Sequence, residues 1–291
     1  MGTVVTIGNF DGVHLGHQAL INQTAEIANA RGLESLAITF EPHPAVIHHP
    51  DSAPPLLTGY EERLKQMQLT GIGHIEVIPY TEEFASQSDV EFVKNYLLDK
   101  YDTKVIVLGA DAKFGKGNTG DLATLREMGH ECGFEVIEFE AVGPEAGPRW
   151  SSSEARKAIQ AGDMPKAKLI LGRNHSVTGL VVHGDHRGRT LGFPTANLSE
   201  IQGLIPPDGV YAGFLDGQAA AISIGTNPTF TDGDEKRVEA YVLDRDDLDF
   251  YGQNVRLEFI AKIRDTLKFD SIDELVKTMN HDVEQVRAII G

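Results

Sequence analysis

Hydrophobic positions in the first half of the chain alternate between two periods. Short apolar runs rich in β-branched residues predict buried strands at residues 4–7, 36–40, 75–78, 105–108 and 134–139. Apolar residues at helical spacing lie between them, at 15–30, 61–69, 90–98 and 122–132. This alternation predicts a parallel sheet with helices on both faces. Sites in such sheets lie beyond the carboxyl ends of the strands, which is where we expect residues 8–17 and 109–120.

The pattern changes past the middle of the chain. Residues 151–171 have helical spacing with a break near Gly162, and Gly172 follows them. Short strands separated by turn residues then appear at 177–183, 209–214, 219–224, 238–243 and 255–263, which indicates an antiparallel sandwich or barrel. Residues 272–290 form an amphipathic helical pattern. We therefore expect an α/β domain over residues 1–171 and an antiparallel β domain with a terminal helix over residues 172–291.

Charge and composition limit the classes of partner. The chain has 26 Lys and Arg against 43 Asp and Glu, a formal net charge of −17, and such a field repels nucleic acid. No apolar run approaches the roughly 18 residues needed to cross a bilayer, so we expect no membrane partner. The single cysteine, Cys132, favours a reducing compartment, and we expect a cytoplasmic protein. The sequence does not determine an oligomeric state.

The segment GNFDGVHLGH, residues 8–17, has the features of a phosphate site. His14 and His17 share one face at the start of the predicted helix, where N–H groups lack intrahelical partners and the helix dipole is positive. Gly16 lets a ligand approach the backbone, so the predicted result is an anion cradle with two imidazole donors. An isolated pair of histidines is more often a surface pair or a solvated cap. A zinc site would need a third ligand at a matching spacing.

This segment resembles the HxGH motif of the nucleotidyltransferase superfamily, in the form found in prokaryotic bifunctional riboflavin kinase/FAD synthetases. TFEPHP at 39–44, GADAKFGKGNTG at 109–120 and RWSSSEAR at 149–156 agree in order. The resemblance implies a Rossmann-like domain that transfers AMP from ATP to FMN, with catalytic His14 and His17. It also implies an ATP-binding set: Gly8, Asn9, Phe10, Asp11, Gly16, Asp111, Arg149, Ser151, Ser152, Ser153 and Arg156.

Three departures from the family pattern concern this first site. Ala112 lies where the family often has an aromatic residue, and Ser153 lies where it often has Thr. Residues 45–49, AVIHH, supply no Phe, Tyr or Trp that could stack on a flavin. By itself, SSSEAR also reads as a capped helix with a surface arginine. The sequence therefore indicates the nucleotide contacts of this site better than its flavin contacts.

The second candidate site is HGDHRGRTLGFPTANL, residues 183–198. It lacks both the P-loop pattern and the dinucleotide fingerprint, and by glycine content alone it reads as a hairpin. Phe193 to Asn197 resembles the PTAN motif of riboflavin kinases, which implies Mg²⁺ and ATP phosphates held by Thr195 and Asn197. Glu239 matches the catalytic glutamate of that family. Alternation puts it on the strand face opposite Val238 and Ala240, and we expect that face to be turned into the barrel. By spacing alone, Glu239 reads equally as a solvent-facing strand residue. The implied ATP- and flavin-binding set is Gly184, Arg187, Gly192, Pro194, Thr195, Asn197, Asn227 and Thr229.

Together these resemblances imply two consecutive reactions, in which ATP phosphorylates riboflavin to FMN and then adenylylates FMN to FAD with release of pyrophosphate. Two alternatives stay open at this point. The chain could be a riboflavin kinase whose first domain is weak or inactive as an adenylyltransferase. It could also be a regulator that binds flavin or nucleotide with little turnover.

Overall fold

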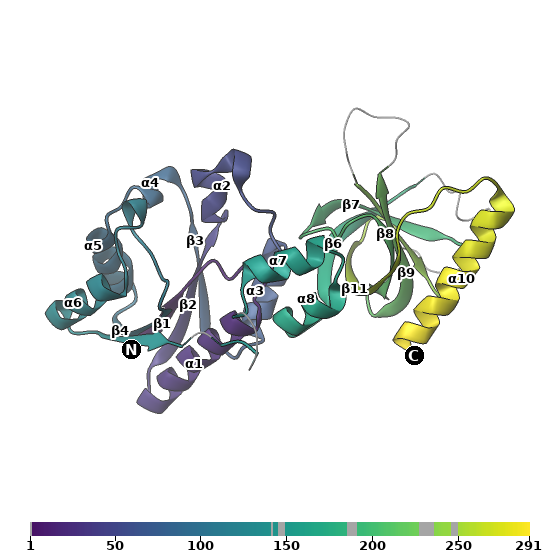
Figure 1. The fold of residues 1–291 in the computed structure, drawn as a ribbon. Coiled ribbons are helices and arrows are strands. Elements are labelled where there is room, and N and C mark those ends of the chain that lie inside the picture. Colours follow the sequence, from purple (N-terminus) through teal and green to yellow (C-terminus); the bar gives the residue numbers. More distant parts are fainter. Residues whose placement is uncertain (1, 141, 145–148, 185–190, 227–235, 246–249) are drawn as a thin grey trace. The chain divides into compact units, whose positions relative to one another are not determined.

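The computed structural model describes residues 2–140, 142–144, 149–184, 191–226, 236–245 and 250–291 (Figure 1). They form two compact units. The first unit comprises Met1–Pro55 and Tyr60–Ser151, and the second comprises Leu56–Gly59 and Ser152–Gly291. Within the described ranges, no helix combines the length and the apolar character that a membrane span requires.

The first unit contains a five-stranded sheet in the order β3-β2-β1-β4-β5, with every neighbouring pair parallel. Its strands are β1 (Thr3–Ile7), β2 (Glu34–Glu41), β3 (His74–Pro79), β4 (Thr103–Gly109) and β5 (Glu135–Phe139). Strands β1 to β4 contain the runs that the sequence pattern predicts, and β5 begins one residue later than its predicted run. The central β1 has β2 on one side and β4 on the other, so the strand order reverses direction there. Loops 8–14 and 110–121 therefore leave the same sheet edge beside each other, at the switch point where ligands bind in open α/β sheets.

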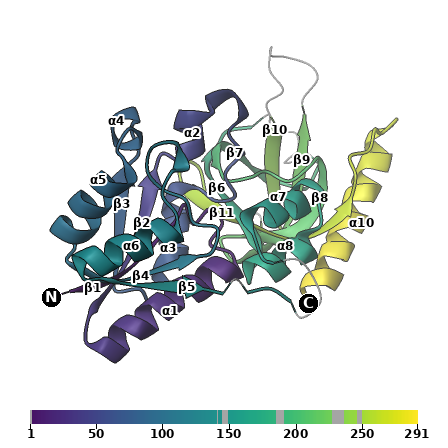
Figure 2. The ribbon, with the colours of Figure 1, turned by 60° about the vertical axis from the view of Figure 1, so that its left-hand side comes forward.

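Helices cover both faces of this sheet, as predicted. Its helical segments are α1 (Leu15–Arg31), α2 (Pro44–His48), η1 (Pro50–Ser52), α3 (Tyr60–Gln68), α4 (Glu82–Ala85), α5 (Asp89–Phe92), η2 (Val93–Lys100), η3 (Lys116–Asn118) and α6 (Leu122–Cys132). Val4 packs with apolar residues of α1 and α3, whereas Val5 packs with those of α5, η2 and α6. Successive strand residues thus face opposite layers. Figure 2 shows the sheet between these helices.

The second unit contains a closed barrel in the order β10-β7-β6-β11-β8-β9. The strands are β6 (His175–Val182), β7 (Thr195–Gln202), β8 (Gly209–Leu215), β9 (Gln218–Thr226), β10 (Lys236–Val242) and β11 (Asn254–Arg264), and each neighbouring pair is antiparallel. The sequence pattern missed β7, because its polar TANLSEIQ has no apolar alternation. Gly213 allows β8 to approach β11, since a Cβ atom there would lie 1.9 Å from the Glu258 carbonyl oxygen.

Two helices precede the barrel, α7 (Ser152–Gln160) and α8 (Met164–Leu171). They pack on each other, and α8 packs on β6 and β11. By its contacts this pair belongs to the second unit, whose main segment starts at Ser152, whereas the boundary predicted from the sequence lies between residues 171 and 172. The reason is that Ile159, Ala167 and Leu171 are buried, and the sequence spacing alone does not reveal which core receives them. The short segment Leu56–Gly59 also joins this unit, where Thr58 bridges Gly203.

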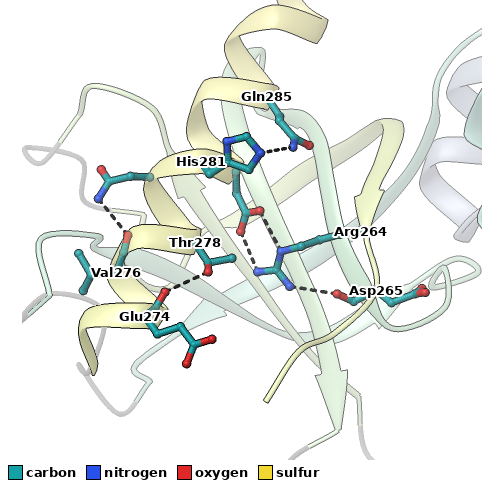
Figure 3. A network of polar contacts seen from close by, with 9 residues as sticks. Arg264, Asp265, Glu274, Val276, Thr278, His281 and Gln285 are labelled. Atoms are coloured by element: carbon teal, nitrogen blue, oxygen red, sulfur yellow. Dashed lines mark hydrogen bonds and ion pairs between the residues drawn. The ribbon is translucent and has the colours of Figure 1, made fainter. Parts of the chain in front are cut away.

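The terminal helix α10 (Ile272–Ile290) lies on the barrel against β8, β9 and β11. Ser271 caps it by accepting a hydrogen bond from the Glu274 N–H. The Arg264 guanidinium, labelled in Figure 3, donates to both carboxylate oxygens of Asp282, at 2.8 and 2.7 Å. Asp282 is only 4% exposed. This bidentate pair ties the last strand to the helix that covers it.

Breaking the Arg264–Asp282 pair is expected to destabilise the second unit. Asp282→Ala leaves a guanidinium without its carboxylate in a mostly buried position, so we expect the free energy of unfolding to fall by about 3 kcal/mol. Asp244→Ala is the matched control, because its pair with Arg287 is exposed and screened by water. Guanidinium denaturation followed by circular dichroism measures both. Equal effects of the two substitutions would contradict this reading of the buried pair.

Candidate functional sites

The loop between β1 and α1 is held in an unusual backbone conformation. Phe10 has φ of 49° and Val13 has φ of 38°, although neither is glycine. Left-handed backbone costs an ordinary residue about 1–2 kcal/mol. Both side chains are buried in the core on one face of the sheet, at 1% and 0% exposure, and this burial offsets the strain. The loop is thus fixed by packing at the carboxyl end of the central strand.

His14 is the N-cap residue of α1. Its Nδ1 accepts hydrogen bonds from the Gly16 N–H (3.1 Å) and the His17 N–H (3.3 Å). The sequence analysis expected first-turn N–H groups to await an anion, and for these two that expectation is wrong, because the histidine ring itself accepts from them. An accepting Nδ1 places the ring proton of neutral His14 on Nε2. His14 therefore presents an N–H donor from a ring locked by its own helix.

The rings of His14 and His17 stack, with centroids 3.7 Å apart and an interplanar angle of 24°. Phe10 meets the His17 ring edge-on at 5.3 Å. Burial of the His17 ring, and secondarily the charge of His14, lower the pKa of His17 well below its ordinary value. His17 Nδ1 is buried and has no hydrogen-bond partner among the described residues. Burial therefore favours the neutral form of the His17 ring.

Gly16 marks where a second segment approaches this turn. A Cβ atom on Gly16 would lie 3.0 Å from His14 Cε1 and 3.4 Å from the Trp150 carbonyl oxygen. The chain at Arg149 and Ser151 therefore passes close to the first turn of α1. Asp111, after β4, is exposed at the same sheet edge as Gly8, Asn9 and Asp11. Ser152, Ser153 and Arg156 lie on α7 and belong to the second unit.

A cavity of about 610 Å³ opens beside this loop. Gly8 and Asn9 line it on one side. Its apolar wall is aromatic and comprises Phe40, Tyr80, Phe84, Phe92 and Phe114. Phe40 lies 5.4 Å from Tyr80 and 5.7 Å from Phe84, measured between ring centroids.

Sequence reasoning missed this aromatic wall. Residues 45–49 contain no Phe, Tyr or Trp, and the rings come instead from β2, α4, α5 and the segments after β3 and β4. Residues 45–49 contribute a polar contact instead. His48 Nε2 lies 2.8 Å from the Tyr80 hydroxyl, and burial raises the pKa of Tyr80. The available signal was that Phe40 ends one predicted strand and Tyr80 closely follows another.

The second candidate site lies across β7 and β10. The strands pair Thr195 with Tyr241 and Asn197 with Glu239. Thr195 Oγ1 donates to Glu239 Oε2 at 3.3 Å, and Arg237 Nη1 lies 3.6 Å from Glu239 Oε1. The structure therefore brings together the threonine, asparagine and glutamate that the sequence analysis selected from segments about 40 residues apart.

Glu239 lies on the face of β10 opposite Val238 and Ala240, as expected, but this face is not the buried one, so the expected inward orientation is wrong. Val238 and Ala240 on either side of it are buried with Leu198 and Ile224, and alternation along β10 puts Glu239 on the opposite face. Its side chain is 28% exposed. The carboxylate thus avoids the apolar interior, where an unpaired charge would cost several kcal/mol.

Glycines shape the backbone around this site. A Cβ atom on Gly184 would lie 2.4–2.6 Å from the side-chain amide of Asn197, so only glycine leaves room for that amide. Gly192 has φ of 87°, which favours glycine, and it precedes Phe193, whose ring contacts Tyr241. Pro194 then leads into β7. Three residues of the sequence prediction, Arg187, Asn227 and Thr229, lie outside the described residues.

The side-chain oxygen atoms at this site are suitable ligands for a hard cation. Thr195 supplies a hydroxyl oxygen, Asn197 an amide oxygen and Glu239 carboxylate oxygens, which are ligands that Mg²⁺ accepts. Asn197 Nδ2 lies 3.5 Å from the Thr195 carbonyl oxygen, an arrangement that directs its nitrogen to the backbone and leaves Oδ1 as the ligand atom. No cluster of three or more His, Cys, Asp or Glu that could hold a metal occurs in the described part of the chain.

The depressed pKa of His17 is measurable. We expect the His17 ring to be neutral at pH 6.5, because burial disfavours its charged form. The unfolded chain binds this proton more readily, so the stability that neutral His17 contributes is present above pH 6.5 and is lost as the pH falls below it. NMR titration of the His17 Cε1–H signal, assigned through a His17→Gln variant, measures the pKa.

A companion variant tests the second cause of this shift. His14→Asn keeps an N-cap acceptor but removes the neighbouring imidazole, so the pKa of His17 is expected to rise partway toward its ordinary value. A wild-type His17 that titrates near pH 6.5 would contradict the burial of its ring.

Comparison with known proteins identifies related chains over the full length. The family model for FAD synthetase matches residues 1–154, and that for riboflavin kinase matches residues 171–290. The bifunctional riboflavin kinase/FMN adenylyltransferase of Escherichia coli (strain K12) is 34% identical over 295 residues, covering 100% of this chain and 93% of that protein. The protein of the same description from Bacillus subtilis (strain 168) is 34% identical, covering 97% of this chain and 91% of its own length.

A solved structure shares the whole fold. It is described as a macrolide-efflux protein from Streptococcus pneumoniae and has a TM-score of 0.88 and 34% sequence identity, covering 98% of this chain and 94% of that one. Both family segments, in this order, and full-length relatives at this identity are sufficient to assign the chain. It belongs to the family of bifunctional riboflavin kinase/FMN adenylyltransferases.

Proposed function

We propose that the chain phosphorylates riboflavin to FMN at the Thr195–Glu239 site and adenylylates FMN to FAD at the His14–His17 site. Small-molecule substrates in a cytoplasmic setting, with no nucleic-acid or membrane partner, complete the proposal. The observation that carries it is that each family segment contains its own assembled site. In the first, two stacked imidazoles follow a loop whose residues Gly8 and Asn9 line an aromatic cavity. In the second, a carboxylate accepts a hydrogen bond from Thr195.

In the adenylyltransferase reaction, a phosphate oxygen of FMN attacks the α-phosphorus of ATP. The bond between that phosphorus and the oxygen bridging to the β-phosphorus breaks, and pyrophosphate leaves. FMN phosphate is already ionised near neutral pH, so this site needs oriented donors rather than a base. The Nε2–H of His14 and the neutral ring of His17 suit that task. The Gly8–His14 loop brings them to the sheet edge where the nucleotide binds.

The aromatic cavity is the proposed flavin site of this reaction. Its volume of about 610 Å³ lies within the range of small-molecule pockets. The rings of Phe40, Phe84 and Phe114 offer the flat apolar surface that an isoalloxazine requires. Gly8 and Asn9, which belong to both the loop and the cavity wall, bring the flavin end and the phosphate end of the substrate together.

In the kinase reaction, the primary hydroxyl of the ribityl chain attacks the γ-phosphorus of ATP. The bond between that phosphorus and the oxygen bridging to the β-phosphorus breaks, and ADP leaves. Unlike a phosphate, an alcohol benefits from a base, and Glu239 is the proposed acceptor of its proton. Thr195 Oγ1 and Asn197 Oδ1 would hold Mg²⁺, which neutralises charge on the ATP phosphates when it is bound. The hydrogen bond from Thr195 to Glu239 holds the carboxylate beside the proposed metal ligands.

Two substitutions are expected to separate the two reactions. His14→Asn retains the helix cap and lacks the Nε2–H donor, so FAD formation from added FMN should fall by about 10²-fold or more while riboflavin phosphorylation is unchanged. Glu239→Gln keeps the shape and loses the base, so phosphorylation should fall by about 10²-fold or more while FAD formation from FMN persists. Chromatography of flavins after incubation with ATP and Mg²⁺ measures both reactions.

The same assay on the unaltered chain distinguishes the alternatives. FAD formed from riboflavin supports the proposal. Accumulation of FMN alone would indicate a kinase whose first unit is inactive. Unchanged riboflavin would indicate a binding protein without turnover. If either substitution reduced both reactions equally in a folded protein, the assignment of one reaction to each site would be wrong.

The close contact at Gly184 gives an independent test of the kinase site. Gly184→Ala would push a methyl group into the Asn197 amide, so phosphorylation is expected to slow by about tenfold or more through misplacement of that ligand. Gly225→Ala on β9 is the matched control, because a Cβ atom there meets nothing within 4 Å. Unchanged phosphorylation in Gly184→Ala would show that the kinase reaction does not depend on the observed position of the Asn197 amide.

A further inference from the structure

Arg63 is a buried cation at the carboxyl edge of the parallel sheet. It lies on α3, and its side chain is only 2% exposed. Its guanidinium donates to the Glu41 carboxylate at 2.6 Å, to the Phe40 carbonyl oxygen at 2.9 Å and to the Asn9 carbonyl oxygen at 3.4 Å. Two of these three acceptors are backbone groups that follow or end the neighbouring strands β1 and β2.

The Asn9 carbonyl is the point where Arg63 reaches the adenylyltransferase loop. The Thr39 hydroxyl donates to the same oxygen at 3.3 Å. Asn9 lines the cavity and directly precedes Phe10, whose backbone has the strained φ of 49° and whose ring contacts His17. Such a conformation persists only where the surroundings determine it fully. Arg63 and Thr39 together fix the carbonyl group of Asn9, the residue directly before Phe10.

An Arg63–Glu41 ion pair that served stability alone would not explain why Arg63 also donates to two backbone carbonyl groups. Glu41 is 40% exposed, so the carboxylate that pairs with Arg63 is itself largely hydrated. An apolar side chain could fill the volume under α3 without the cost of burying a guanidinium. It could not donate to two carbonyl groups on neighbouring strands at once, which the planar fork of arginine does. The positive charge also favours the polyanionic substrates proposed for this edge.

We propose that Arg63 is a positioning residue of the adenylyltransferase site, holding the Gly8–His14 loop through the Asn9 carbonyl so that His14 and His17 meet the α-phosphate. This inference rests on the proposed function of the first unit. Arg63 has no contact with the barrel strands that carry the kinase site among the interactions described, so its effect is confined to one of the two reactions.

The test measures both reactions in one full-length preparation of Arg63→Met. FAD formation from FMN, ATP and Mg²⁺ is expected to fall about 10- to 100-fold in kcat, with KM for FMN changed by less than about threefold, because the reacting groups are misplaced rather than unbound. Riboflavin phosphorylation by the same sample is expected to be unchanged, and it serves as the internal measure of folding. Arg126→Met, which removes an exposed pair with Glu138, is the matched control for both reactions.

Two milder variants keep the test decisive if Arg63→Met folds poorly. Arg63→Lys retains the charge but not the planar fork, so partial rescue of kcat is expected. Thr39→Val removes the second donor to Asn9 at constant volume, and kcat should fall in the same direction by a smaller factor. The NMR signal of the His17 Cε1–H should shift in each variant, because Phe10 leaves its edge-on contact, and a merely structural role would not move it.

Failure of the proposed function and failure of the Arg63 proposal give different experimental results. If the unaltered chain makes no FAD, the proposed function itself fails. If it makes FAD and Arg63→Met or Thr39→Val does so equally fast, Arg63 does not position the loop. Equal loss of both reactions in all three variants, or a rise in KM alone with kcat unchanged, would also overturn the inference.

Discussion

The hydrogen bonds from the Gly16 and His17 N–H groups to the His14 ring set the geometry on which the first site depends. They cap α1 and fix the ring tautomer, so one side chain both begins the helix and presents a donor from it. The His17 ring stacks on the His14 ring and meets the Phe10 ring edge-on. Burial of the Phe10 side chain and the residues that flank it hold the Phe10 backbone in its strained conformation. Fold and chemistry are inseparable at this turn, because the cap is also the proposed catalytic group.

The two sites place their polar groups differently, and the reactions proposed for them give a reason. The first site uses two imidazoles just beyond the end of a strand, because a phosphate nucleophile needs donors and no base. The second places a carboxylate beside a hydroxyl and an amide on the outer face of a barrel, because an alcohol nucleophile needs a base and ATP needs a cation. With a net charge of −17, the chain holds polyanions through local donors of this kind rather than through its overall field.

Periodicity predicted most of the elements because they are amphipathic or fully buried. The run at residues 122–132 predicted α6 with its ends as observed, since Asp121 caps its start and Gly133 ends it in a left-handed conformation. The polar strand β7 was missed, because its residues form pairs with β6 and β10 that no local pattern records. The inward orientation expected for Glu239 was wrong for a related reason, as only closure of the barrel determines which face of β10 is buried.

By itself, the sequence determined the fold class, the order of the elements and the motifs that carry the chemistry, because strand and helix periods and ordered motifs are local properties of the chain. Only the tertiary structure decided which groups meet. It placed the aromatic wall of the cavity from five separate segments, turned the His14 ring onto its own helix and brought Arg63 to the Asn9 carbonyl across 54 residues. These contacts depend on strand order and side-chain packing, and the spacing of residues along a chain does not encode either one locally.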